Sequence, residues 1–152
     1  MKKFFQIILG ISFLFLLVGC SSQETATFTH KSNNAEFIVT YTYDKKNDTV
    51  TKIKIEMNNP SENTQSRKRD EKLSREVKEN GVLVSFIEKD GKRISLIEID
   101  VTKYKLSSLN ESDKISFINI LSRGFLADEG DHVSFSKSKE NMLKYGFKEE
   151  KK

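Results

Sequence analysis

The stretch that decides the fold runs from Ala35 to Met57 and reads AEFIVTYTYDKKNDTVTKIKIEM. Its first half alternates apolar and polar side chains, which is typical of a β-strand with one buried face. The second half alternates in the same way, and Asp44–Asp48 between the halves has the composition of a hairpin loop. The sequence therefore predicts two antiparallel strands with one face in the core and one in water. The predicted core-facing residues are Phe37, Val39, Tyr41 and Tyr43 on the first strand, and Thr51, Ile53, Ile55 and Met57 on the second.

Three further strands are expected around this hairpin. Residues 25–30 alternate and are rich in threonine, a β-branched residue that favours strands. Downstream, the runs 82–87 and 93–99 flank Asp90-Gly91, and an Asp-Gly pair between two such runs is a strong hairpin signal. These patterns predict a sheet of about five antiparallel strands.

Two segments between and after these strands have helical periodicity. Residues 63–80 are rich in charge, with Leu73 and Val77 four apart, and Gly81 would end that helix. Residues 112–123 place several aliphatic side chains on one helical face. Both segments are expected to be helices that pack on the sheet.

A third helix is predicted near the C-terminus. It would begin at Ser136 as the N-cap and end at Gly146, with Phe147 as the hydrophobic partner of the C-cap. We therefore predict a single α+β domain, in which an antiparallel β-sheet of about five strands is packed by two or three helices.

The first nineteen residues have the pattern of a bacterial export signal. Lys2 and Lys3 form a positive head, and a mostly apolar run follows from Phe4 to Val18. This run has about 15 residues, whereas about 20 are needed to span the hydrocarbon core of a bilayer. We therefore expect a signal peptide at 1–19 and not a permanent transmembrane helix.

The single cysteine of the chain, Cys20, stands at the end of this run. With the preceding Leu17-Val18-Gly19 it resembles the lipobox of bacterial lipoproteins. That resemblance implies cleavage between Gly19 and Cys20 and a diacylglyceryl lipid on the Cys20 thiol, the nucleophile that such a reaction requires. Two acyl chains give stable membrane anchoring. The alternatives are an ordinary signal with a chance cysteine and a buried core cysteine.

After the signal, the chain is long enough for one domain. We expect a lipidated N-terminus and short tether at 20–25, the folded domain at 26–148 and a tail at 149–152. The chain has 26 basic and 22 acidic residues, and two of the lysines leave with the signal. This near balance argues against a nucleic-acid partner. With its one thiol lipidated, the domain has no disulfide and depends on core packing.

The densest cluster of potential metal ligands is Asp128-Glu129-Gly130-Asp131-His132. Its spacing matches no EF-hand pattern, so we interpret it as a solvated acidic loop and expect no metal site. His30 and His132 are the only histidines, and no serine lies in a nucleophile-elbow motif. The sequence therefore predicts no catalytic residues, and we expect a protein that is not an enzyme.

Two other groups of residues are candidate binding surfaces. Arg67-Lys68-Arg69 would attract an anionic surface, but Asp70 and Glu71 follow directly and favour a solvated helix face. The aromatic stripe of the first long strand is interpreted as sheet core and not as a binding platform.

Taken in order along the chain, these features resemble the YehR-like family of small bacterial lipoproteins. The resemblance implies an α+β domain with an antiparallel sheet and a few helices, and it supplies no mechanism and no catalytic residues. Residues 110–134 match poorly. The resemblance rests on the lipobox at Cys20, the strand 37–43 with Val50 on its return, the segment 97–109 and the closing Gly146-Phe147-Lys148.

We therefore expect a lipoprotein of the cell membrane, anchored at the extracytoplasmic face, whose domain is a non-enzymatic binding or envelope-associated module. Its expected partners are membrane lipid through the anchor and a protein or small molecule held by the domain. No nucleic acid and no cofactor beyond the lipid on Cys20 are expected. The alternatives are a small-ligand-binding accessory protein of a transporter and a small envelope hydrolase. A polar pocket would favour small-ligand capture, whereas a flat aromatic patch would favour a protein partner.

Overall fold

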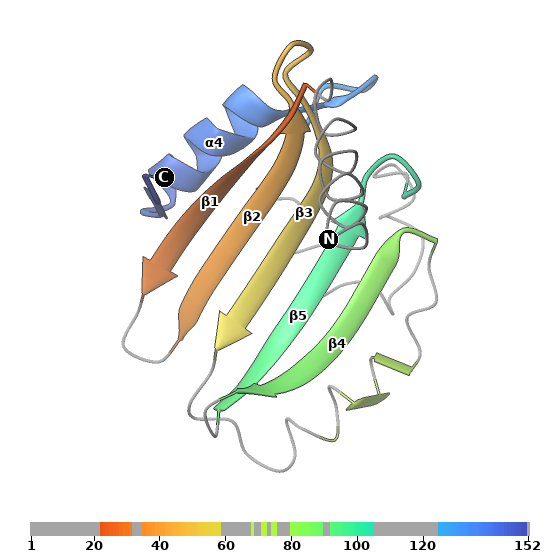
Figure 1. The fold of residues 1–152 in the computed structure, drawn as a ribbon, viewed down its shortest axis with the longest axis vertical. Helices are drawn as coiled ribbons and strands as arrows, with labels where there is room; N and C mark the ends of the chain where they lie inside the picture. The colour runs from red at the N-terminus through yellow and green to blue at the C-terminus, as the bar shows by residue number, and fades with distance from the viewer. Residues whose placement is uncertain are drawn as a thin grey trace, which may run out of the picture.

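The computed structural model describes residues 22–31, 35–58, 68, 71–72, 74–75, 80–89, 92–104 and 125–151. In this part of the chain, an antiparallel sheet of eight strands carries one complete α-helix (Figure 1). The strands are β1 (Gln23–Lys31), β2 (Glu36–Asp44), β3 (Thr49–Asn58), β4 (Val82–Lys89), β5 (Lys92–Asp100), β6 (Ala127–Asp128), β7 (Val133–Ser134) and β8 (Lys148–Glu149), and the helix is α4 (Phe135–Lys144).

The strand order across the sheet is β4-β5-β3-β2-β1-β8, and β7 pairs with both β3 and β6. The two predicted hairpins, β2–β3 and β4–β5, are both confirmed. They join through β5, which pairs antiparallel with β3 so that the two hairpins form one continuous sheet (Figure 1). The strand predicted at residues 25–30 is β1, which pairs with β2 on its other side.

The predicted α+β architecture, with about five strands packed by two or three helices, is wrong. The described residues form eight strands and one complete helix, so the fold is mainly antiparallel sheet. Periodicity missed β6, β7 and β8 because two residues are too few to show alternation. Residues 68, 71–72 and 74–75, within the predicted helix 63–80, are helical, but the remainder of that segment lies outside the described residues. The predicted helix 112–123 lies outside them entirely.

The β2–β3 hairpin forms the centre of the core. Tyr41 lies opposite Ile53, and Val39 lies opposite Ile55. All four side chains are buried, as the alternation predicts. Cross-strand pairs of aromatic and β-branched residues of this kind stabilise a sheet by packing against each other on one face.

The start of β3 departs from the predicted alternation. The pairing with β2 shifts by one residue between Thr42 and Tyr43, so that Tyr43 lies opposite Val50. Such a β-bulge changes the direction in which the following side chains point. Val50 is therefore buried in the core, whereas Thr51, predicted to face the core, is half-buried and donates its hydroxyl hydrogen to the carbonyl of Thr42 at 3.2 Å.

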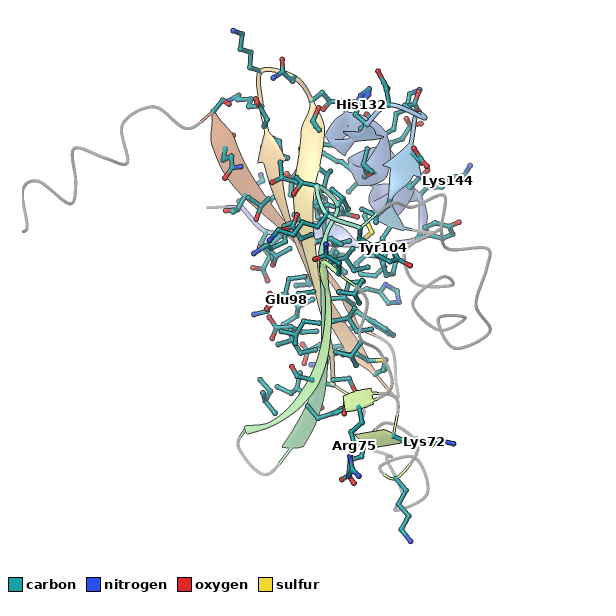
Figure 2. All side chains as sticks on the ribbon, turned by 90° about the vertical axis from the view of Figure 1, so that its right-hand side faces the viewer. Lys72, Arg75, Glu98, Tyr104, His132 and Lys144 are labelled. Atoms are coloured by element: carbon teal, nitrogen blue, oxygen red, sulfur yellow. The ribbon has the colours of Figure 1, made fainter. Side chains whose placement is uncertain are left out.

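Among the described elements, α4 and the residues after it cover one face of the sheet. Figure 2 shows the sheet from its side, with α4 on one side and Glu98 on the other. Phe135 and Met142 of α4, and Phe147 beyond it, are buried against this covered face. Among the described residues, this part of the core therefore lies between the sheet and the C-terminal segment.

The N-cap of α4 is Ser134, and the predicted N-cap Ser136 lies inside the helix. The Ser134 hydroxyl accepts a hydrogen bond from the backbone N–H of Lys137 at 3.3 Å. Ser134 has extended backbone angles, as N-cap residues usually do. The predicted N-cap is therefore wrong by two residues, and both serines contact Asp48 of the β2–β3 hairpin.

The predicted C-cap of α4 is confirmed. Gly146 has φ +82°, and its N–H donates to the carbonyl of Leu143 at 3.0 Å. The N–H of Phe147 donates to the carbonyl of Met142 at 3.0 Å, which completes a Schellman motif. Phe147 is buried, so it is the hydrophobic residue that this motif commonly places against the core.

Both ends of the described chain belong to the sheet. β1 starts at Gln23, inside the segment 20–25 that the sequence assigns to a tether, and β8 reaches Glu149 at the start of the predicted tail. No helix among the described residues combines the length and the apolar character that crossing a bilayer demands.

Candidate functional site

The candidate site lies at the end of the sheet where β1 begins, which we call the Ser22 end. Here Gln23 lies opposite Asp44, and the backbone N–H of Lys45 donates to the carbonyl of Ser22 at 2.9 Å. The ammonium of Lys45 pairs with the carboxylate of Glu24 at 2.9 Å. Ser22 is therefore joined to the tip of the β2–β3 hairpin through backbone and side-chain contacts.

Asp48 connects this hairpin to the start of α4. Its backbone has φ 52°, which Asp tolerates better than most residues. One carboxylate oxygen, Oδ1, accepts from the backbone N–H of Ser136 at 2.9 Å, and Oδ2 accepts from the hydroxyls of Ser134 and Ser136, each at 2.7 Å. The carbonyl of Asp48 also accepts from the N–H of Phe135 at 2.9 Å. A negative side chain thus stabilises the positive end of the helix dipole.

The pKa of Asp48 reflects these contacts. Partial burial opposes its ionisation, but the hydrogen bonds from Ser134 and Ser136, with a smaller contribution from His132, outweigh burial and lower the pKa below its ordinary value. Asp48 is therefore held ionised by the fold, and its carboxylate is committed to a structural role.

A hollow of about 560 Å³ lies at the Ser22 end, beside this helix start. Three of the residues that line it, Val50, Tyr104 and Val133, are buried. No Lys or Arg is among the described residues that line the hollow. The polar residues that line it are Thr49, Thr102, Asp128, Asp131 and His132.

The predicted acidic loop forms one wall of this hollow. Asp128 accepts from the N–H of Gly130 at 2.8 Å, and Asp131 contacts the Nδ1 of His132 at 2.6 Å. The contact with His132 lowers the pKa of Asp131 below its ordinary value. Glu129 points away to Lys137, whose ammonium lies 2.6 Å from it. These contacts hold the loop in shape and leave most of the Asp131 side chain in solvent, at 86% exposure.

No group of three or more His, Cys, Asp or Glu side chains in the described ranges is arranged to hold a metal ion. The two histidines also lie far apart in the sheet. His132 lines the hollow, whereas His30 is near the other end of β1, where its Nδ1 lies 3.2 Å from the carbonyl of Gly146 and its ring packs on Phe147. The structure therefore brings no second histidine to the hollow.

The aromatic stripe of β2 belongs to the core, as predicted. Tyr41 is fully buried, and its hydroxyl donates to the carbonyl of Phe125 at 2.6 Å. Tyr43 is partly buried, stacks on Phe135 with ring centroids 3.6 Å apart, and donates its hydroxyl to Glu24 at 3.1 Å. These rings are held by neighbours within the fold and do not form a flat platform for a partner. In the predicted basic patch 67–69, Lys68 is exposed and the two arginines lie outside the described residues.

Comparisons with known proteins agree on one family. A lipoprotein of Listeria innocua, Lin0239, described as uncharacterised, is 30% identical over 145 residues, which are 90% of this chain and 88% of the relative. The solved structure of the Escherichia coli YehR protein superimposes with a TM-score of 0.63 at 22% identity, over 84% of this chain and 90% of YehR. The chain is a YehR-like lipoprotein.

A protein from Streptococcus pneumoniae has a similar fold, with a TM-score of 0.58 at 12% identity over 84% of this chain and 85% of that one. No protein-family model matches the YehR-like chain. Its predicted lipidation residue Cys20, and Gly19 at the predicted cleavage site, lie outside the described residues. The relative supports the coarser statement that the chain is a lipoprotein, and the lipidation of Cys20 stays a prediction.

Sequence reasoning missed the two features that build the site of this YehR-like lipoprotein. Asp48 looked like an ordinary loop residue, and its partners Ser134 and Ser136 lie 86 and 88 residues away. The hollow is formed by β3, the turn after β5 and the loop before β7, which no local pattern connects. The one available signal was Ser136, predicted as the N-cap of a helix, which indicated a cap but not its partner.

Proposed function

We propose that this YehR-like lipoprotein is anchored by a lipid on Cys20 at the extracytoplasmic face of a membrane and that its domain captures a small molecule in the hollow at the Ser22 end. The domain would act as a binding module and not as an enzyme. The observation that carries the proposal is the hollow itself, which is lined by both buried apolar and polar side chains and lies at the Ser22 end of the sheet.

The anchor is supported by the sequence and by the relative. Leu17-Val18-Gly19-Cys20 has the residue types of a lipobox, and the Listeria innocua relative is a lipoprotein. The signal-like residues 1–19 before Cys20 support export, and therefore the extracytoplasmic face.

The hydrogen bonds of the polar side chains that line the hollow favour ligand capture over catalysis. Nucleophilic catalysis needs a nucleophile, a base and a group that orients the base. At the hollow, Asp131 contacts His132 and could orient it, but the hydroxyls of Thr49 and Thr102 are bonded to Asn47 and Asp100. Both threonine hydroxyls thus donate to acceptors other than His132, which favours ligand capture over nucleophilic catalysis.

Capture is also favoured over a protein partner at the aromatic stripe, because those rings are in the core. The lining of the hollow includes the carboxylates of Asp128 and Asp131 together with the apolar side chains of Val50, Val101 and Val133. Such a surface suits a small amphipathic molecule whose polar end donates hydrogen bonds or carries positive charge.

The anchor is tested by Cys20→Ala in the full chain. Cells fed a labelled fatty acid should label the wild-type protein and not the variant, and the variant should leave the membrane fraction. Label on Cys20→Ala, or its full retention in membranes, would contradict the lipid anchor.

The hollow is tested with a defined probe, a dansyl-labelled alkylamine, and a protein that starts at Ser21. The amine should gain fluorescence on binding, whereas a dansyl-labelled alkanoic acid of equal length should not. Asp131→Asn should weaken binding of the amine several-fold, because it removes a carboxylate from the lining of the hollow. Glu150→Gln, directly after the edge strand β8 and outside that lining, should leave binding unchanged. Equal binding of the amine and the acid, or no effect of Asp131→Asn, would count against the proposed ligand class.

A further inference from the structure

The position of Ser22 limits where the membrane can lie. Its carbonyl accepts from the N–H of Lys45 at 2.9 Å, and a hydrogen bond from Ser22 lowers the pKa of Asp44 in the same hairpin. Ser22 is therefore part of the fold. Cys20 is two residues earlier, and two Cα–Cα steps span at most about 7 Å. A lipid on Cys20 would hold the hairpin tip close to the bilayer, with Ser21 as the spacer.

The rest of the sheet extends away from this point. β1 has nine residues from Gln23 to Lys31, which corresponds to about 30 Å at ~3.3 Å per residue. Lys46, at the exposed hairpin tip, and Lys31, at the other end of β1, therefore mark opposite ends of the sheet (Figure 1). The loop 129–132 is at the Ser22 end with the hairpin, because β7 pairs with Thr49 at the first residue of β3.

The charged side chains at the Ser22 end would not by themselves attract an anionic membrane. Three of the cations here, Lys45, Lys103 and Lys137, are paired with Glu24, Asp100 and Glu129. Lys46 has no ion pair among the described residues, but Asp44, Asp48, Asp128 and Asp131 add four carboxylates at the same end. Contact with headgroups would therefore depend on the covalent anchor, and added salt would have little effect on it.

From these observations we infer that the domain stands on the bilayer with its Ser22 end against the lipid headgroups, so that the hairpin Lys45–Asp48 and the loop 129–132 form the membrane-facing surface. This inference rests on the proposed lipidation of Cys20. The proposed orientation also places the hollow next to the membrane, because the residues that line the hollow are at the Ser22 end. A ligand would then enter the hollow from the layer of solution next to the headgroups.

The test uses the full chain, acylated in bacteria, purified in detergent and reconstituted in vesicles of phosphatidylcholine and phosphatidylglycerol that contain a headgroup-nitroxide lipid. Lys46→Cys and Lys31→Cys each receive a fluorophore, and the lipidated protein has no other thiol because Cys20 is the single cysteine. Both lysines are exposed, so the two variants are a matched pair.

The probe at residue 46 should lose most of its fluorescence to the nitroxide, the probe at residue 31 should keep most of its own, and the difference should persist at high salt. Equal quenching, or stronger quenching at residue 31, in protein shown to carry fatty acid would overturn the orientation alone. Absence of fatty acid from the wild-type protein would overturn the proposed anchor and the orientation with it. The same labelled variants on a Cys20→Ala background should show no quenching at either position.

Discussion

Ser136 donates two hydrogen bonds to the carboxylate of Asp48, from its backbone N–H at 2.9 Å and from its hydroxyl at 2.7 Å, across 88 residues of sequence. Asp48 thus acts as a capping group for α4 from a distant hairpin. It satisfies an N–H in the first turn of the helix, which has no partner within the helix itself. This contact joins the β2–β3 hairpin to the C-terminal segment.

Replacing Asp48 with Asn should destabilise the domain by about 1–2 kcal/mol, the range found for the loss of helix caps and of hydrogen bonds to charged groups. Asn is the appropriate replacement because it tolerates the positive φ of this position. The measurement is urea denaturation followed by circular dichroism. Glu140→Gln, an exposed carboxylate on α4, is the control and should change stability by less than about 0.5 kcal/mol. Equal stability of Asp48→Asn and wild type would contradict the capping role.

The same residue should make stability depend on pH. The pKa of Asp48 is lower in the folded protein than in the unfolded chain, so its contribution is fully present above the unfolded value of about 3.9. The contribution should decline as pH falls through the lower, folded pKa, because the carboxylate then gains a proton and loses acceptor capacity. Thermal melts from pH 7 to pH 2 should show a smaller acid destabilisation for Asp48→Asn than for wild type. Parallel curves for the two proteins would argue against this linkage.

Tyr41→Phe should cost about 1–2 kcal/mol, because it removes the hydroxyl that donates to the partly buried carbonyl of Phe125 at 2.6 Å. Burial raises the pKa of Tyr41 well above its ordinary value. Its absorbance change in alkali should therefore appear only when the protein unfolds. Tyr145→Phe is a suitable control for stability, since that side chain is 60% exposed and its hydroxyl should contribute less than about 0.5 kcal/mol. Normal titration of Tyr41 in the folded state would show that the ring is accessible.

Gly81 and Gly130 allow conformational strain to be separated from steric clash. Both have positive φ, +84° and +94°. A Cβ at Gly81 would lie 2.8 Å from the carbonyl oxygen of Asp100, whereas a Cβ at Gly130 would have no atom within 4 Å. Gly130→Ala should cost about 1 kcal/mol from backbone strain, and Gly81→Ala should cost more because the turn after β5 must also move. Equal melting temperatures for the two variants would show that the clash is relieved at no cost.

Two neighbouring residues of α4 test which helix face is in the core. Met142 is fully buried and Leu143 is 47% exposed. Met142→Ala should destabilise the domain by about 2–5 kcal/mol through lost burial and the cavity left behind, whereas Leu143→Ala should cost about 1 kcal/mol or less. Chemical denaturation of both variants would measure the difference. A larger loss at Leu143 would mean that α4 packs with a different face.

Local sequence pattern identified the long strands because each has enough residues to show alternation. The Asp90-Gly91 pair and the charged loop Asp44–Asp48 were sufficient to predict both hairpins. The Schellman motif at Gly146 was also predictable, because its requirement for a positive φ is met by one residue type.

Other features depend on contacts that no local window contains. The choice of Ser134 over Ser136 as the N-cap follows from the position of Asp48. The burial of Val50 in place of Thr51 follows from a bulge set by pairing with β2. The sequence therefore predicted Cys20 as the residue that determines location, but the hollow requires three separate segments to meet and could not be inferred from any of them.

The pairing of β8 with β1 also bears on how such a chain reaches its native state. Phe28 lies opposite Glu149, and the N–H of Glu150 donates to the carbonyl of Thr27 at 2.9 Å, so the first strand obtains its outer neighbour from the last few residues. A chain that crosses a membrane N-terminus first would lack that neighbour, and α4, until nearly all of it had emerged. Contacts of such large sequence separation form slowly and carry a high entropic cost of closure. For the proposed export, this topology would delay completion of the fold until most of the chain had crossed the membrane.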